Sequence, residues 1–269
     1  MMRPSARGQR VKRRFARRWT GDAVRESSLT AERRLALLGE WWAAGELARL
    51  MASPVYYGVG LPRGTGRTVL LLPGLFGNDL YLEPVHRWLR RLGHHPVRSR
   101  LAVNAGCPER LSRQVESELA REELAGPVAL VGHSRGGLLA WAIAARLGAR
   151  TSHLVLIASP VAPMRAPPGA GGPTTAAAPG VVDASLRARR LLDPDCTFPD
   201  CGCPFVEDLR RSLHPAARVV SFSTRDDAVV VPAACRVEGA QNIELRGTHS
   251  GLVYNTDLLR ELAALIAAP

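Results

Sequence analysis

Residues 128–137 constrain the fold most, because they join a short apolar run to a serine flanked by glycines. Residues 128–131 are apolar and follow Gly126-Pro127, which is typical of a strand that is too short to be a helix. The next five residues read Gly-His-Ser-Arg-Gly (132–136), and an apolar run over 138–145 follows as an expected helix. This order predicts a nucleophile elbow, in which a strained turn holds the Oγ of Ser134 outside the sheet. An ordinary strand-to-helix turn of the same composition is the alternative.

Short apolar segments alternate with amphipathic ones along the rest of the chain. We expect strands at 68–72, 96–103, 128–131, 153–158, 218–223 and 242–245, and helices at 80–92, 108–124, 138–147 and 255–268. The segment 68–72 is almost wholly apolar, as in strands that are buried on both faces of a parallel sheet. The alternation predicts an α/β fold with a mostly parallel central sheet and helices on both faces.

The net charge of +12 belongs mainly to the N-terminal end of the chain. Residues 1–20 hold eight basic residues and no acidic one, so the remainder carries only +4. We expect residues 1–28 to form a solvated, disordered arm, with weak contact to a membrane surface or to nucleic acid as the alternative. No secretory signal and no transmembrane run is recognised. We therefore expect a cytoplasmic protein without a nucleic-acid partner, with membrane association through the arm as the alternative.

Two further segments lie outside the regular alternation. Residues 29–66 predict an N-terminal helix and a linker packed on the core, with a membrane-surface helix as the alternative. Residues 67–269 form the predicted main domain, which an insert at about 160–215 interrupts. The insert begins with a Pro/Gly/Ala-rich run of low complexity and continues as a loop-rich stretch. Such an insert in an α/β domain is typical of a lid or a binding loop, so we expect it to select the substrate.

Ser134 is followed along the chain by candidates for an acid and a base. Asp226 and Asp227 come directly after the expected strand at 218–223, and His249 follows the last expected strand. The ends of parallel strands meet at one edge of the sheet, where ligands bind in open α/β folds. A serine nucleophile needs a base and an acid that orients the base, so this order predicts a catalytic triad. An elbow that has lost its chemistry and a loop histidine bonded to backbone are the structural alternatives.

On these residues the sequence resembles the α/β-hydrolase superfamily, and within it bacterial lipase- and esterase-type proteins. The resemblance begins near Val69 and is carried by five segments, which are Pro73–Asn78, Gly132–Gly137, Ser159–Val161, Asp227–Val230 and His249–Leu252. It implies the α/β-hydrolase fold, with the N-terminal helix and the lid-like insert as additions. It also implies hydrolysis of carboxylic esters of apolar acyl groups through an acyl-enzyme on Ser134.

The resemblance also assigns roles to single residues. Asp227 is the better match for the acid, because it precedes one small and two β-branched residues, and Asp226 is the alternative. The backbone N–H groups of Leu75 and Arg135 match the oxyanion donors. The family often has His-Gly where this chain has Pro-Gly at 73–74, so the N–H of Phe76 is an alternative first donor.

Phe76 and Met164 are the expected substrate contacts, from the oxyanion loop and the insert. The expected substrate is a small-molecule or lipid-like ester. An acyltransferase would use the same triad, and a non-catalytic protein of this fold would act through its basic arm. These two functions stay open as alternatives at this point.

Cysteines and glycine-rich loops bear on cofactors. The five cysteines are odd in number, and Cys196, Cys201 and Cys203 cluster in the insert, with Cys235 further on. Their spacing departs from that of structural zinc sites, so we expect free thiols, with a disulfide or a metal as alternatives. No glycine-rich phosphate or dinucleotide loop is present. We expect neither a cofactor nor a metal.

Overall fold

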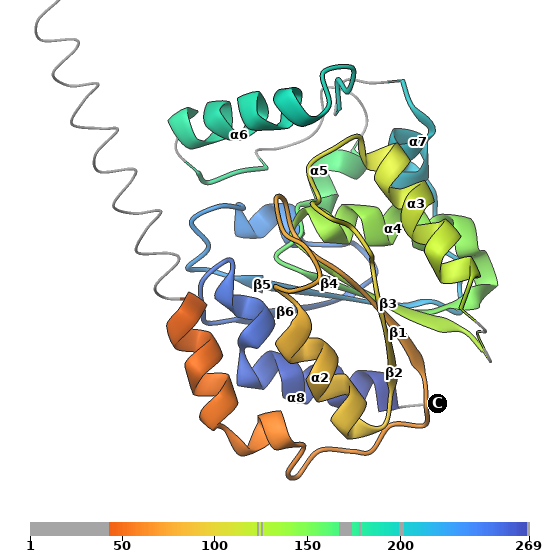
Figure 1. The fold of residues 1–269 in the computed structure, drawn as a ribbon, viewed down its shortest axis with the longest axis vertical. Helices are drawn as coiled ribbons and strands as arrows, with labels where there is room; N and C mark the ends of the chain where they lie inside the picture. The colour runs from red at the N-terminus through yellow and green to blue at the C-terminus, as the bar shows by residue number, and fades with distance from the viewer. Residues whose placement is uncertain are drawn as a thin grey trace, which may run out of the picture.

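A central sheet of six parallel strands organises the molecule (Figure 1). Its strands are β1 (Thr68–Leu72), β2 (His95–Arg98), β3 (Val128–His133), β4 (Thr151–Ile157), β5 (Arg218–Thr224) and β6 (Gln241–Leu245). Their order across the sheet is β2-β1-β3-β4-β5-β6. The chain thus builds outward in opposite directions from β1 and β3, and the crevice at such a reversal is where α/β sheets bind ligands.

The structure, a computed structural model, describes residues 43–122, 124, 126–166, 174–177, 179–198 and 202–267. The basic arm, the start of the predicted N-terminal helix and Cys201 lie outside the described residues. So does residue range 167–173, which holds most of the Pro/Gly/Ala-rich run. The described part of the N-terminal segment is helical over 43–52, and its Leu50 is fully buried.

Helices cover both faces of the sheet. The helices α2 (Glu83–Leu92) and α8 (Thr256–Ala267) lie on one face, and α3 (Pro108–Ala120) and α4 (Arg135–Leu147) lie on the other (Figure 1). In β1, Val69 and Leu71 pack in the hydrophobic core under α2 and α8, while Leu70 and Leu72 pack in the core under α3 and α4. Among the described residues, short 3-10 helices also lie at Pro54–Tyr57, Gly148–Arg150, Pro232–Cys235 and Gly251–Tyr254. This confirms the expected fold class.

Glycines end two of the helices. Gly93 ends α2 in the left-handed region with φ of 91°, and Gly148 ends α4 with φ of 56°. Glycine adopts these angles without the steric cost that a side chain brings. Among the described residues, no helix is both long and apolar enough to cross a membrane.

Three predicted elements are too long by three residues or more. The helix expected at 80–92 begins only at Glu83. The strand expected at 96–103 ends at Arg98, because the Asp79 carboxylate takes the N–H groups of Ser99 and Arg100 at 3.0 and 2.8 Å. Arg100 then has a φ of 56°, which no strand residue adopts. The helix expected at 108–124 ends at Ala120, where bonds between residues three apart close its last turn.

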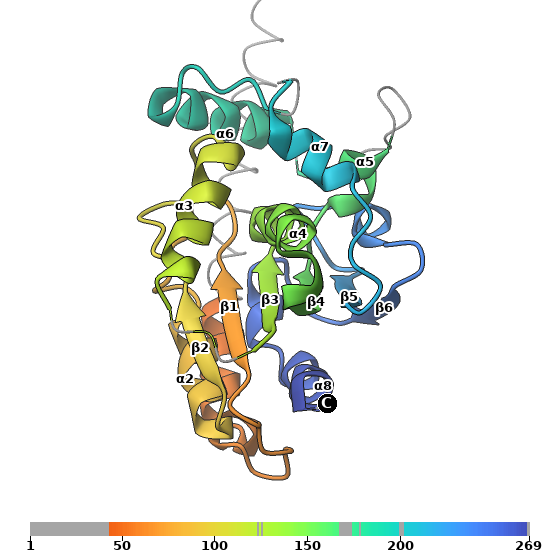
Figure 2. The same cartoon turned by 90° about the vertical axis from the view of Figure 1, so that its right-hand side faces the viewer.

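The insert has more regular structure than the sequence predicted. It contains α5 (Val161–Arg165), α6 (Pro179–Leu192) and α7 (Pro204–Arg210), so the expectation of a loop-rich stretch is wrong for its second half. Residues 184–192 consist mostly of good helix formers, which explains α6. Figure 2 shows α6 beyond the carboxyl ends of the strands, the edge at which the predicted site residues lie.

Candidate active site

The elbow predicted at residues 132–136 is present between β3 and α4. Ser134 has a φ of 52°, and its N–H donates to the Ile157 carbonyl at 2.7 Å. A Cβ on Gly132 would lie 2.5 Å from the Gly136 carbonyl oxygen, and a Cβ on Gly136 would run into the Leu72 and Pro73 carbonyls. Because backbone atoms cannot move aside, only glycine permits this close approach of strand and helix.

The structure brings Ser134, His249 and Asp227 together from the ends of three different strands. The Oγ of Ser134 lies 3.0 Å from Nε2 of His249, and Nδ1 of His249 lies 2.8 Å from Oδ2 of Asp227. Both distances are within hydrogen-bond range. All three residues are buried. This is the arrangement of a nucleophile, a base and an acid that orients the base.

Local bonds distinguish Asp227 from Asp226. The Oδ1 of Asp227 accepts the N–H groups of Val229 and Val230, each at 2.8 Å, and its Oδ2 is left to face His249. Asp226 is exposed, and its carboxylate accepts no hydrogen bond from another described residue. The geometry therefore favours Asp227, as the resemblance implied.

The loop after β1 lies against the elbow because β1 and β3 are neighbours, with Leu72 opposite Gly132. A Cβ on Gly74 would lie 2.9 Å from Nδ1 of His133 and 3.2 Å from Cβ of Ser134, so this glycine allows the approach. The Phe76 N–H already donates to the Asn104 carbonyl at 3.0 Å, which removes the alternative first donor.

The remaining N–H groups suit an oxyanion hole. Within the described part of the chain, neither the Leu75 N–H nor the Arg135 N–H donates to another protein group. The Arg135 N–H is also the first of helix α4, where the backbone carries partial positive charge. Two such donors beside the Ser134 hydroxyl are what an oxyanion requires.

The Arg135 side chain ties the elbow to the loop after β1. It is buried, and its Nη1 donates to Oδ1 of Asn104 at 2.6 Å, while its Nη2 donates to the Gly106 carbonyl at 2.5 Å. Asn104 in turn donates through Nδ2 to the Pro73 carbonyl at 2.7 Å. Burial lowers the pKa of Arg135 to about 10, so the guanidinium stays charged at neutral pH. No pattern in the sequence predicts this network.

His133 makes a contact that its place in the sequence does not predict. Its Nε2 lies 2.9 Å from the His249 carbonyl oxygen, which can only accept, so Nε2 carries the proton. Burial, and then the neighbouring His249, lower the pKa of His133 to about 3, so the ring is neutral. The hydroxyl of Tyr81 donates to the Ser250 carbonyl. The variable position of the elbow thus helps to hold the loop that carries His249.

Apolar side chains flank the site. Leu75 and Phe76 in the loop after β1 are 38% and 41% exposed, and Val229, two residues after Asp227, is 42% exposed. Met164 of α5 is half-buried against the core that α4 covers. Contact of Phe76 and Met164 with a substrate stays a prediction.

Among the described residues, Cys107, Asp193 and Cys196 form one group that could hold a metal ion, with ligand atoms within 4.8 Å of one another. The Asp193 carboxylate is already used, because its Oδ2 accepts the Cys107 N–H and pairs with Arg110. In the described chain Cys107, Cys196 and Cys235 are free thiols. Cys196 thus lies beside Cys107 and Asp193, a grouping that the spacing of the cysteines does not predict, while Cys201 lies outside the described residues.

Comparisons with known proteins agree with this architecture. No protein-family model matches the chain, and no curated protein matches it. A metagenomic carboxyl esterase of solved structure matches with a TM-score of 0.53 at 14% identity, over 77% of this chain and 78% of the esterase. A pyrethroid hydrolase from Sphingobium faniae matches with a TM-score of 0.50 at 16% identity, over 76% of this chain and 98% of the hydrolase. From the parallel sheet, the elbow and this likeness, we conclude that the chain has the α/β-hydrolase fold.

Proposed function

We propose that the protein is a serine hydrolase that cleaves carboxylic esters of apolar acyl groups through an acyl-enzyme on Ser134. The observation that carries the proposal is the unbroken hydrogen-bond chain from Ser134 through His249 to Asp227. A serine hydroxyl is a weak nucleophile unless a base takes its proton, and this chain supplies the base in hydrogen-bond contact. The esterase and the hydrolase of similar fold support the proposal at the level of hydrolase chemistry.

In the first half of the proposed reaction, Oγ of Ser134 attacks the ester carbonyl carbon while its proton passes to Nε2 of His249. Asp227 accepts the Nδ1–H of the ring, which fixes the tautomer and stabilises the imidazolium. The N–H groups of Leu75 and Arg135 hold the oxyanion. When the tetrahedral intermediate collapses, the C–O bond to the alcohol breaks and His249 gives its proton to the departing alcohol.

In the second half, water takes the place of the alcohol. His249 removes a proton from the water as it attacks the acyl carbonyl, and the carboxylic acid leaves when the bond to Oγ breaks. The proton on His249 returns to Ser134, so the enzyme ends as it began. The preference for apolar acyl groups is supported by the exposed apolar side chains of Leu75, Phe76 and Val229 near these groups.

The test is hydrolysis of p-nitrophenyl esters from short to long acyl chains by the wild type and by Ser134→Ala. We expect turnover by the wild type that falls by about 10⁶-fold in the variant, as in other triad hydrolases. The acyl length with the highest kcat/KM reports the size of the acyl site. Equal rates for the two proteins on every ester would reject the proposal.

Product analysis with an added alcohol separates hydrolysis from acyl transfer, because both use the same acyl-enzyme. We expect the free carboxylic acid as the main product. A new ester as the main product would replace the hydrolase by an acyltransferase.

A further inference from the structure

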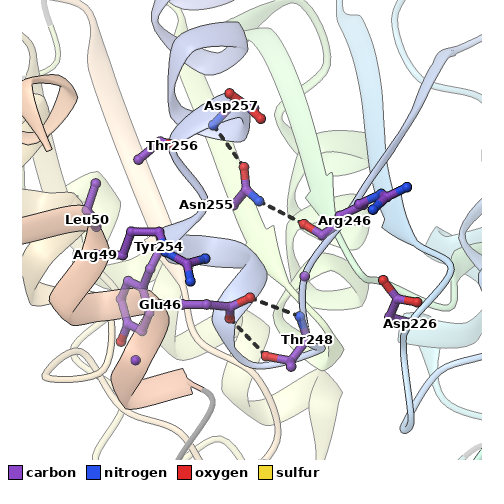
Figure 3. Close-up of a pocket in the computed structure, with 12 residues that line it drawn as sticks. Glu46, Arg49, Leu50, Asp226, Arg246, Thr248, Tyr254, Asn255, Thr256 and Asp257 are labelled. Atoms are coloured by element: carbon purple, nitrogen blue, oxygen red, sulfur yellow. Dashed lines mark hydrogen bonds between the residues drawn. The ribbon is translucent and has the colours of Figure 1, made fainter.

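The Glu46 carboxylate reaches from the N-terminal helix (43–52) to the residue that precedes His249 (Figure 3). Its Oε1 accepts the Thr248 N–H at 3.1 Å, and its Oε2 accepts the Thr248 hydroxyl at 2.9 Å. Glu46 and Thr248 are 202 positions apart in the chain. One carboxylate therefore fixes both the backbone and the side chain of Thr248.

The loop that carries His249 is shaped around this carboxylate. A Cβ on Gly251 would coincide with the carboxylate of Glu46, and a Cβ on Gly247 would lie 3.0 Å from its Oε1. The Thr248 hydroxyl also accepts the Gly251 N–H at 3.1 Å. The hydrogen bonds that begin at Glu46 thus link the residues on both sides of His249. Since both glycines leave room for one acidic side chain, the contact is part of how the loop is built.

The two sides of His249 are thus held by different elements. Glu46 holds the preceding residue from the N-terminal helix, and His133 holds the His249 carbonyl from the elbow. The ring must keep Nε2 at 3.0 Å from Ser134 and Nδ1 at 2.8 Å from Asp227. A backbone shift of about 1 Å would break both contacts, and errors of that size can cost about 100-fold in rate.

We propose that Glu46 is a positioning residue, which keeps His249 in place between Ser134 and Asp227. This inference rests on the proposed function and adds to it a role for the segment before the main domain. It also gives the N-terminal helix a part in catalysis beyond packing, without contact to the substrate.

The surroundings of Glu46 allow this role to be tested without unfolding the protein. Glu46 is half-buried at the wall of a cavity of about 780 Å³, which Arg49, Asp226, Arg246 and Asp257 also line (Figure 3). When the carboxylate is removed, a water molecule in the cavity can accept the hydrogen bond from the Thr248 N–H. Arg49 is exposed on the same helix and makes no hydrogen bond or ion pair within the described chain, so it provides the matched control.

The experiment compares Glu46→Ala, Glu46→Gln and Arg49→Ala on the best p-nitrophenyl ester. We expect Glu46→Ala to lower kcat by roughly 10- to 100-fold with KM little changed, because ground-state binding does not involve the loop. Glu46→Gln can accept the Thr248 N–H and donate to the Thr248 hydroxyl, so it should recover most of kcat. Arg49→Ala should match the wild type, and Tm should vary little across the set.

Two results would overturn the role of Glu46. One is a kcat for Glu46→Ala equal to that of Arg49→Ala, and the other is a Glu46→Gln variant as impaired as Glu46→Ala. Hydrogen exchange of the peptide over 247–252 gives a readout that does not need activity, and Glu46→Ala should exchange faster there than Arg49→Ala. If the wild type itself fails to hydrolyse esters, the proposed function fails, while the exchange data still decide whether Glu46 holds the loop.

Discussion

The two loops that meet at Ser134 and His249 are held in contrasting ways. The elbow takes its shape from its own sequence, because Gly132 and Gly136 let β3 and α4 approach within contact of the β1 backbone. The loop with His249 is also held from outside, by hydrogen bonds to Glu46, Tyr81 and His133. The nucleophile is thus fixed by local sequence, and the base is fixed by residues far away in the chain.

This difference explains which parts of the site a substitution can damage. A change inside the elbow meets backbone atoms, so it should act on folding. A change at Glu46, Tyr81 or His133 removes a side-chain contact to the loop with His249, so it should lower the catalytic rate.

The largest effect should come from the acid that orients His249. Asp227→Asn keeps the bonds to the Val229 and Val230 N–H groups but favours the wrong tautomer of His249, so kcat should fall by about 10⁴-fold. Asp226→Asn, at the exposed neighbour, should stay within about twofold of the wild type. Steady-state kinetics on one ester measures both, and equal losses in the two variants would contradict the assignment.

The elbow should respond through stability. Gly136→Ala would press a Cβ into the Leu72 and Pro73 carbonyls, so we expect the free energy of unfolding to fall by about 3 kcal/mol or more. Gly45→Ala is the control. Gly45 is exposed in a helix, and a Cβ there would have no atom within 4 Å, so the substitution should raise the free energy of unfolding by up to about 1 kcal/mol. Urea unfolding measures both. An unchanged midpoint for Gly136→Ala would show that the elbow is not fixed by backbone contact.

His133 links the two loops and should show a smaller effect of both kinds. Its pKa of about 3 in the fold is below the value of about 6.5 in the unfolded chain, so the unfolded state binds the extra proton between these values. Stability from this group is therefore complete above pH 6.5 and decreases as the pH falls toward 3. Burial, assisted by nearby arginines, lowers the pKa of His153 to about 4, with the same sign.

His133→Phe and His153→Phe provide the matched pair. Each substitution should remove one of the protons that the chain takes up when it unfolds in acid. The slope of the free energy of unfolding against pH should therefore fall by up to about 1.4 kcal/mol per pH unit. Only His133→Phe should also lower kcat, by roughly tenfold, because the His249 carbonyl loses its donor. Urea unfolding from pH 4.5 to 7.5 and ester kinetics measure the pair, and an equal kcat for both variants would remove His133 from the link.

The same contrast sets how much the sequence could predict. The elbow, the alternation of strands and helices, and the order of Ser134, Asp227 and His249 follow from local patterns, and the structure brings those three residues together. The holding contacts of Glu46 and His133 join residues 202 and 116 positions apart, and no spacing in the sequence marks them. The predicted end of the second strand at residue 103 was also wrong because of a contact outside the local sequence, the bond from the Ser99 N–H to the Asp79 carboxylate.

The most direct test of Ser134 as an activated nucleophile is its covalent labelling. A fluorophosphonate probe reacts with a serine only when a base activates it, and peptide mapping by mass spectrometry locates the adduct. We predict one adduct on the peptide that contains Ser134 in the wild type, none in Ser134→Ala, and much slower labelling in Asp227→Asn. Absence of labelling in the folded wild type, or labelling at another serine that survives in Ser134→Ala, would show that Ser134 is not the activated nucleophile.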